Sequence, residues 1–335
     1  MRYLCLLLLL VGLMSSPVHA AEPVKIIFDT DMDSDCDDVG ALAMLHALAD
    51  LGEAEILATT VSSKNIWSPL CVSAINQFYR RADLPIGVPK GKAAEKPTKY
   101  AKVISERFAH KLESAEKAPD AVEVWRKILE AQADGSVTIV TVGYLTNVAD
   151  LLKRPAEGDR ISGMELAKKK VKQWVCMGGN FVGDPAKDDL KLGNNNFTFD
   201  KEGSLYAVKN WPGRLLFVGR EIGSVPSGLK VGARLKELPA ENPIRLGYEL
   251  YFGGVAKDRH VADQTTVLAA VRGPEKFWDV KEGGMMDLAA DMTFAWKNME
   301  GGKQAYVLKR KDNRNGIDRE VEKVIEGLMM KERRQ

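Results

Sequence analysis

Residues Val24–Asp38 read VKIIFDTDMDSDCDD, an apolar run followed at once by six aspartates within ten residues. The apolar part is typical of a buried strand, and residues 39–50 after the aspartates have helical spacing. In sheets of mainly parallel strands, ligands bind beyond the carboxyl ends of the strands, where these aspartates stand. Crowded carboxylates repel one another unless a cation neutralises them, and hard divalent cations such as Ca²⁺ or Mg²⁺ prefer oxygen ligands. The stretch therefore predicts a metal site at the end of a strand.

The rest of the chain alternates short strand-like runs with amphipathic helical stretches. Further strands are expected at 54–61, 84–88, 136–142, 171–177 and 213–219, and helices at 69–82, 121–134, 201–211, 263–273 and 318–333. Residues 289–296 and 304–310 are expected to form a hairpin. This alternation predicts an α/β fold with a mainly parallel central sheet flanked by helices. No interdomain linker is evident, so residues 21–335 are expected to form a single domain.

The first twenty residues have the pattern of a signal peptide. A single basic residue, Arg2, precedes an apolar run that is too short to span a bilayer, and Val18 and Ala20 suit a cleavage site. We therefore expect an exported protein, periplasmic or secreted, with no membrane association after cleavage. The three cysteines that remain cannot all pair, so a disulfide framework is not expected.

The charge balance argues against a nucleic-acid partner. The chain has 48 Lys and Arg against 46 Asp and Glu, a formal net charge of only +2. Nucleic-acid binding usually requires a basic surface, which a nearly neutral chain does not indicate. A small-molecule partner is the better expectation.

The aspartate stretch has three other possible interpretations. A solvated acidic loop with Asp38 as a helix cap is the simplest. An EF-hand loop is excluded, because the positions that need Gly and Glu hold other residues in each register. A haloacid-dehalogenase-like phosphatase, with Asp29 as nucleophile and Mg²⁺ as the ion, fits the FDTDMD opening, but Asp33 stands where that chemistry wants Thr or Val.

Several motifs together resemble the inosine-uridine-preferring nucleoside hydrolases, a family of calcium-dependent N-ribohydrolases. They lie in the expected order along the chain: DTDMDSDCDD (29–38), TTVSSKN (59–65), TVGYLTNVA (141–149), MGGN (177–180), NNNFTFD (194–200) and ADQTTVLAAV (262–271). The resemblance implies the Rossmann-like nucleoside hydrolase fold and cleavage of the N-glycosidic bond of ribonucleosides or related ribosides. It also allows a homo-oligomer, since family members are often dimers or tetramers.

The resemblance further implies a role for each matching residue. The Ca²⁺ ligands would be Asp31, Asp38, the backbone carbonyl of Val142, and Asp263. Asp31 would also be the catalytic base, which takes a proton from a calcium-bound water as that water attacks the anomeric carbon. Asp29 would fix the loop by hydrogen bonds. Without the resemblance, Asp263 reads as an ordinary helix N-cap.

The substrate-binding residues follow from the same resemblance. Asp37 would hold a ribose hydroxyl and Asn65 the ribose diol. Asn196 would bind the 5′ side of the ribose, and Asn194 stands where the family has a glutamate on that side.

The sequence departs from the family in two further places. Five residues separate Asp31 from Asp37, more than is usual, and they add Asp33 and Asp35. Ala262 replaces a histidine that is thought to help the leaving base depart, while His260 stands two residues away, as a substitute or as a surface residue. A riboside-binding protein with impaired catalysis and the phosphatase therefore remain alternatives to an active hydrolase.

Overall fold

The computed structural model describes residues 22–181, 190–191, 195–224, 227–310 and 316–332. The expected signal peptide and Asn194 lie outside these residues. Nine strands of the described chain form one sheet, in the order β2-β1-β3-β4-β6-β11-β9-β10-β5. The strands from β2 to β11 are parallel to their neighbours, and the last three are antiparallel. In sheet order, the strands are β2 (Ala54–Val61), β1 (Val24–Thr30), β3 (Val137–Thr141), β4 (Val171–Met177), β6 (Leu215–Val218), β11 (Gln304–Leu308), β9 (Asp279–Leu288), β10 (Thr293–Asn298) and β5 (Leu190–Lys191). The mostly parallel sheet confirms the predicted fold class.

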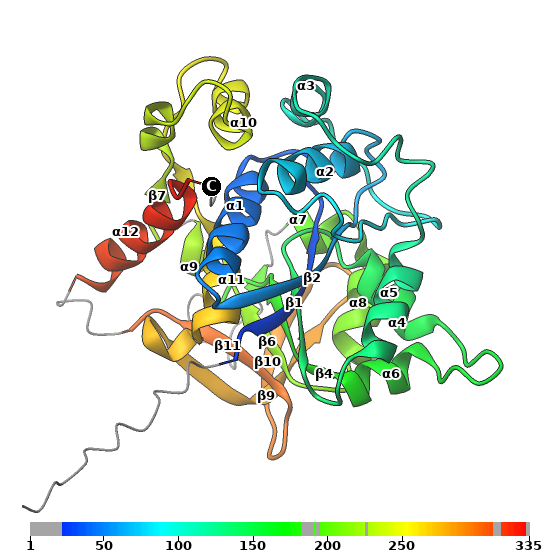
Figure 1. Ribbon diagram of the computed structural model, residues 1–335. Coiled ribbons are helices and arrows are strands. Elements are labelled where there is room, and N and C mark those ends of the chain that lie inside the picture. Colours follow the sequence, from blue (N-terminus) through cyan, green and yellow to red (C-terminus); the bar gives the residue numbers. More distant parts are fainter. Residues whose placement is uncertain (1–21, 182–189, 192–194, 225–226, 311–315, 333–335) are drawn as a thin grey trace, which may run out of the picture.

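Helices cover both faces of this sheet (Figure 1). Alternate side chains of a strand point to opposite faces, and in β1 Ile26 and Phe28 pack into one core while Ile27 packs into the other. The first core is covered by α1 (Asp37–Asp50), α2 (Ser68–Phe78), α3 (Ala101–Arg107), α10 (Pro243–Phe252), α11 (Ala262–Arg272) and α12 (Ile317–Met329). The second is covered by α4 (Ala121–Ala131), α5 (Thr146–Lys153), α6 (Gly163–Lys170) and α8 (Lys201–Asn210).

Short elements lie at the edge of the sheet where the parallel strands end. They are α7 (Asn195–Thr198), α9 (Arg220–Gly223) and β8 (Arg259–His260), which forms a small ladder with β7 (Lys230–Val231). Two 3₁₀ turns, η1 (Ala233–Glu237) and η2 (Pro274–Lys276), pack against α10 and α11, respectively. Helix α1 begins at this edge and is buried almost throughout, packed between β2, α11 and α12. A helix buried on all sides needs an apolar sequence, which explains its run of Ala, Leu and Met.

The aspartate stretch occupies the centre of this edge. Asp29 on β1 is in register with Thr60 on β2 and Thr141 on β3, so the three strands end together. Gly143, just after β3, permits this close approach, because a Cβ there would lie 2.3 Å from the amide nitrogen of Asp31. The sequence motif around Gly143 is thus explained by backbone packing.

Two predicted elements are wrong. Residues 84–88 form only an isolated bridge from Val88 to Asp120, not a strand. Strands β10 and β11 do not pair as a hairpin, because β9 lies between them. Strand β9 was missed since its glycines and charges, DVKEGGMMDL, lack the alternation typical of a strand.

Two expectations about the environment of the chain can be compared with the described residues. Cys36, Cys71 and Cys176 are all free and buried, consistent with the absence of a disulfide framework. None of the helices in the described ranges is long and apolar enough to cross a membrane.

Candidate functional site

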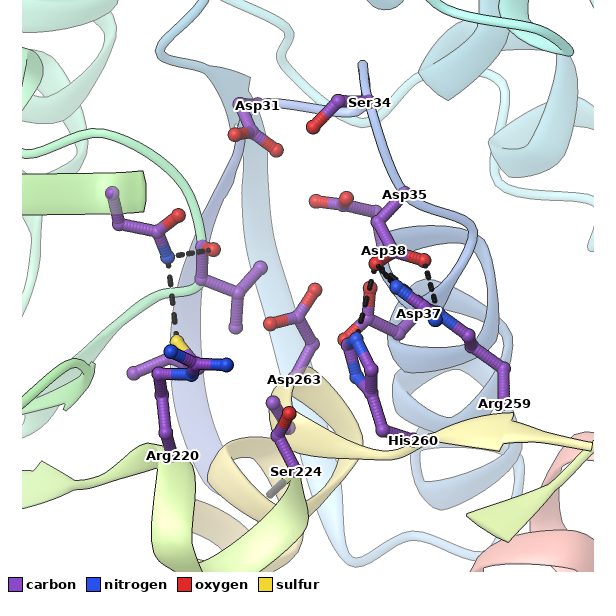
Figure 2. Close-up of a pocket in the computed structure, with 14 residues that line it drawn as sticks. Asp31, Ser34, Asp35, Asp37, Asp38, Arg220, Ser224, Arg259, His260 and Asp263 are labelled. Carbon is purple, nitrogen blue, oxygen red and sulfur yellow. Dashed lines mark hydrogen bonds and ion pairs between the residues drawn. The ribbon is translucent and has the colours of Figure 1, made fainter. Parts of the chain in front are cut away.

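A pocket of about 360 Å³ opens at the carboxyl ends of the parallel strands (Figure 2). Residues from the loop after β1, from the start of α1, and from β8 and α11 meet there, although more than 200 positions separate them in sequence. The lining residues are Asp31, Ser34, Asp35, Asp37, Asp38, Val142, Met177, Asn196, Arg220, Ser224, Arg259, His260, Ala262 and Asp263. Five of them are aspartates, so the pocket is strongly acidic.

Two of the six aspartates in the stretch are used to fix the loop and do not line the pocket. Asp29 accepts hydrogen bonds from Thr60 Oγ1 at 2.7 Å and from Asn147 Nδ2 at 2.8 Å. Asp33 accepts hydrogen bonds from Tyr144 at 2.8 Å and from Ser63 at 3.0 Å. Burial raises the pKa of Asp29 to about 7 against the lowering effect of its hydrogen bonds.

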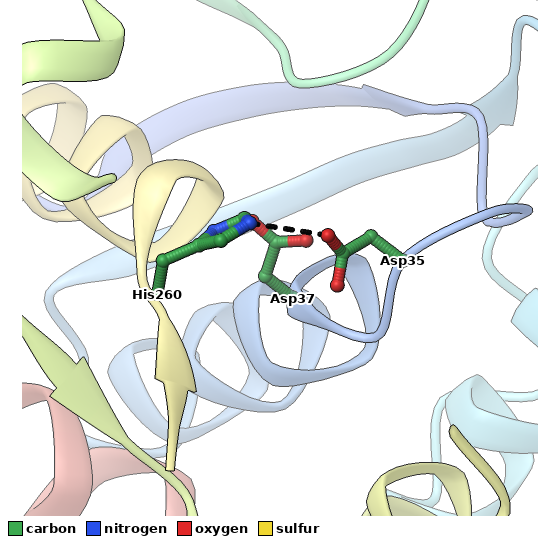
Figure 3. Close-up of side chains that lie close together, drawn as sticks. All are labelled: Asp35, Asp37 and His260. Atoms are coloured by element: carbon green, nitrogen blue, oxygen red, sulfur yellow. Dashed lines mark ion pairs between the residues drawn. The ribbon is translucent and has the colours of Figure 1, made fainter. Parts of the chain in front are cut away.

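Asp35 and Asp37 are paired with the cationic side chains of Arg259 and His260 (Figure 2 and Figure 3). The guanidinium of Arg259 binds Asp35 through Nε at 2.9 Å and through a second nitrogen. His260 lies between the two carboxylates, with Nε2 3.1 Å from Oδ2 of Asp35 and Nδ1 3.2 Å from Oδ2 of Asp37.

These pairs shift the pKa values of both partners. Burial acts against the charged carboxylate, but the hydrogen bonds from His260 and Arg259 outweigh it and lower the pKa of Asp35. Burial likewise lowers the pKa of His260, but Asp37 and Asp35 more than offset it and raise that pKa to about 9. His260 is therefore a charged pocket residue, and its interpretation as a surface histidine is wrong.

Asp37, Asp38 and Asp263 form a second group, deeper in the pocket. Their nearest carboxylate oxygens all lie within 4.8 Å of one another, and all three residues are buried. Asp38 accepts hydrogen bonds from the hydroxyl of Thr30 and, at 3.3 Å, from the amide of Met32. Within the described ranges, no Lys, Arg or His forms an ion pair with Asp38, Asp263 or Asp31.

The lack of ion pairs to Asp31, Asp38 and Asp263 in the part of the chain that the structure describes is accompanied by a shift of their pKa values. Burial first, and then repulsion from neighbouring aspartates, raises the pKa of all three carboxyls well above its ordinary value. Bringing these groups together ionised requires an added positive charge. An all-oxygen donor set of this kind fits a hard divalent cation.

The two simplest readings of these aspartates are wrong. The stretch is not a solvated loop, because Asp31, Asp37 and Asp38 are all buried. Neither Asp38 nor Asp263 is a helix cap, since the N-cap positions of α1 and α11 are Cys36 and Val261.

Val142 and Asn196 also line the pocket. The side-chain nitrogen of Asn196 donates to the carbonyl oxygen of Val142 at 2.6 Å. A carbonyl oxygen has two lone pairs, so the same atom can also face a metal.

Asn65 lies outside this pocket. Its Oδ1 accepts from the amide of Trp67 at 3.0 Å and closes a local turn, while its Nδ2 donates to the carbonyl of Lys96, 31 positions later, at 2.8 Å. It lines a separate cavity beside β2. Asn194 is not among the described residues.

Arg220, Ser224 and Arg259 line the pocket but were not singled out from the sequence. Arg220 stands two residues after the end of β6, and the carboxyl end of a parallel strand is itself a signal for a site residue. Arg259 is adjacent to His260, but no local pattern indicates that it reaches Asp35, 224 positions earlier.

Comparison with known proteins assigns the chain to a family. The family model described as inosine-uridine preferring nucleoside hydrolase matches residues 26–218. Among curated proteins no relative is found.

Solved structures share the fold over most of this chain. An inosine-uridine preferring nucleoside hydrolase from Bacillus anthracis is 13% identical and superposes with a TM-score of 0.62, covering 90% of this chain and 99% of its own. An inosine-guanosine nucleoside hydrolase is 18% identical, with a TM-score of 0.63 and coverages of 90% and 98%. The type III effector protein XopQ complexed with adenosine diphosphate ribose is 13% identical, with a TM-score of 0.60 and coverages of 93% and 94%.

Proposed function

Because the chain belongs to the inosine-uridine preferring nucleoside hydrolase family, we propose that it hydrolyses the N-glycosidic bond of ribonucleosides or related ribosides, with Ca²⁺ as its metal. The observation that carries this proposal is the group of buried carboxylates for which the described chain supplies no cation. Asp31, Asp38, Asp263 and the carbonyl of Val142 are the residues that would hold the ion. When bound, calcium supplies coordination for the sugar diol and orients a water molecule.

Asp31 is the proposed general base. It lines the pocket beside the other proposed calcium ligands, and its carboxylate, kept ionised when the cation is bound, can accept a proton. Asp31 accepts a proton from the water as the water oxygen bonds to the anomeric carbon. The carbon–nitrogen bond breaks, and the departing base keeps the electron pair.

Asp37 and Asn196 are proposed to hold the sugar. In this proposal Asp37 accepts a hydrogen bond from a ribose hydroxyl. Asn196, which is hydrogen-bonded to the carbonyl of Val142, binds the 5′ side of the ribose. Positive charge develops on the sugar in the transition state of glycoside hydrolysis, and the surrounding carboxylates stabilise it.

A riboside-binding protein without turnover is the second candidate. Ala262 offers no imidazole to the leaving base, and both nitrogens of His260 face carboxylates. The phosphatase alternative is not favoured, because Asp29, its nucleophile, is fully buried and does not line the pocket.

Ribose release from purine and pyrimidine nucleosides, with added calcium and with a chelator, tests the proposal. We expect calcium-dependent release from at least one nucleoside. Calcium-dependent binding of a riboside with no release would favour the binding protein. Neither binding nor release would overturn both candidates.

A further inference from the structure

Asp35, one of the two aspartates that lengthen the acidic loop, is held from three sides. Arg259 binds both of its carboxylate oxygens, with Nε 2.9 Å from Oδ1 and 3.2 Å from Oδ2. His260 approaches Oδ2 at 3.1 Å, and the hydroxyl of Tyr100 donates to the backbone carbonyl of Asp35 at 2.5 Å. The longer loop therefore carries an anchored carboxylate at the rim of the pocket.

His260 connects this anchored carboxylate to Asp37. Its backbone is fixed by pairing with Lys230 across the small β7–β8 ladder, and the amide of the next residue, Val261, donates to Gly223 at 2.7 Å. The Nδ1 atom lies 3.2 Å from Asp37 but makes no well-aligned hydrogen bond to it. The contact is an ion pair, so lone pairs of Asp37 stay available to a sugar hydroxyl.

Asp37 lies between two groups of side chains that can orient its carboxylate differently. It lies within 4.8 Å of the carboxylate oxygens of Asp38 and Asp263, and equally within 4.8 Å of Asp35 and His260. A carboxylate in that position can turn toward a metal shared with Asp38 and Asp263, or stay directed toward a substrate. A fixed positive charge on the other side biases this choice (Figure 3).

We propose that Arg259, Asp35 and His260 form a positioning chain that holds Asp37 in the orientation required to bind the ribose, leaving the metal to Asp31, Asp38 and Asp263. This inference rests on the proposed function. It also gives the additional Asp35 a role, and it assigns His260 to sugar positioning instead of protonation of the leaving base.

The same residues do not form a second metal site. Asp35, Asp37 and His260 have the atom types for one, but the guanidinium of Arg259 already contacts both oxygens of Asp35. The positioning chain therefore predicts one bound divalent ion per chain.

The test compares Asp35→Asn, His260→Gln and Arg259→Gln with wild type in calcium-loaded protein. The hydrogen bond from a ribose hydroxyl to Asp37 is made in the ground state and the transition state alike, and the variants weaken this bond but keep the charge of Asp37. Loss of such uniform binding raises KM while kcat is preserved. We expect KM to rise about tenfold in each variant, as is usual when a supporting residue is lost, with calcium affinity within about twofold of wild type. Arg259→Lys keeps the positive charge but not the two-point contact, so its KM should lie between those of wild type and Arg259→Gln.

Two further variants give the test its controls. Asp35→Asn combined with His260→Gln should be scarcely worse than either single variant, because both act through Asp37. Arg234→Gln removes ion pairs with Glu237 and Glu326, none of which lines the pocket, and should leave KM unchanged. Melting temperatures identify any variant that fails to fold. If one does, the KM of the conservative variant Arg259→Lys tests the positioning chain instead.

The outcomes separate this inference from the proposed function. If wild type is active and the variants keep its KM, the positioning chain is wrong and the proposed function stands. Loss of calcium affinity in the variants, or two ions per wild-type chain, would also overturn the positioning chain. A wild type that neither binds nor cleaves any riboside would overturn both.

Discussion

Asp35 and Asp38 lie three residues apart in one acidic stretch, yet their surroundings differ in kind. Asp35, at the rim, is bound by Arg259 and His260, which lower its pKa against the effect of burial. Asp38 belongs with Asp31 and Asp263 to the floor of the pocket. It is buried without an ion-pair partner in the described chain, and its pKa, like that of Asp263, is raised well above the ordinary value.

The contrast shows how the chain divides its negative charge. One group of carboxylates is neutralised internally and is suited to fixing geometry. The other is left uncompensated, which is costly in a folded protein unless a ligand supplies the charge. The comparison therefore supports the proposals that a cation binds in the floor and that the rim orients the sugar.

The largest effect is expected from Asp31→Asn. The amide cannot accept a proton from water, so kcat should fall by about 10³-fold, within the range for loss of a general base. Circular dichroism should show an intact fold, because Asp31 is replaced by a group of the same shape. Full activity in the purified variant would show that Asp31 is not the base.

Comparing Asp263→Asn with Asp35→Asn tests whether the floor, and not the rim, binds calcium. Replacing one charged ligand should weaken calcium binding by about 100-fold, or about 2.7 kcal/mol, as measured by isothermal titration calorimetry. Asp35→Asn removes the same charge from the rim and should leave calcium affinity nearly unchanged. Equal losses in the two variants would remove the distinction between the groups.

The uncompensated carboxylates also predict a pH dependence. Without metal, their raised pKa values mean that the folded state binds more protons than the unfolded state above about pH 4, so their contribution to stability falls as pH rises. Calcium displaces these protons, and its stabilising effect should grow over the same range. At a fixed calcium concentration, the calcium-induced rise in melting temperature should be larger at pH 7.5 than at pH 5. A pH-independent rise would mean that the floor is not protonated in the metal-free protein.

The smallest effect is expected from Asp33→Asn, in the same loop. Asp33 accepts hydrogen bonds from Tyr144 and Ser63 and does not line the pocket. Weakening these bonds should lower stability by about 1–2 kcal/mol, measured by urea unfolding, with kcat and calcium affinity within about threefold of wild type. A loss of calcium affinity as large as that of Asp263→Asn would place Asp33 among the floor residues.

The central parts of this arrangement could be predicted from sequence. The run from Val24 to Asp38 indicates a buried strand that ends in carboxylates, and the parallel sheet explains why Val142, just after β3, meets it. Asp263, at the start of α11, follows the separate β7–β8 ladder, and only the family resemblance indicated it. Parallel strands all present their carboxyl ends at one edge, so residues distant in sequence converge there.

The partners of each aspartate could not be predicted. Arg259 pairs with Asp35 across 224 positions, and such pairing depends on the placement of β8, a two-residue strand with no sequence pattern of its own. The local sequence gives Asp33, Asp35 and Asp38 the same appearance, although tertiary contacts give them different roles. Asn65 was assigned to the diol by resemblance, while its side chain bonds to the backbone of Lys96 and Trp67.

Calorimetric titration of the metal-free protein with calcium tests the central claim most directly. We predict that one ion binds per chain and that binding releases protons. The proton release is measured by repeating the titration in buffers of different ionisation enthalpy. No binding would mean that the floor of the pocket is neutralised by protons alone, and two ions would mean that the rim is a metal site as well. Either result would contradict the division of the aspartates into a cation-binding floor and a self-compensated rim.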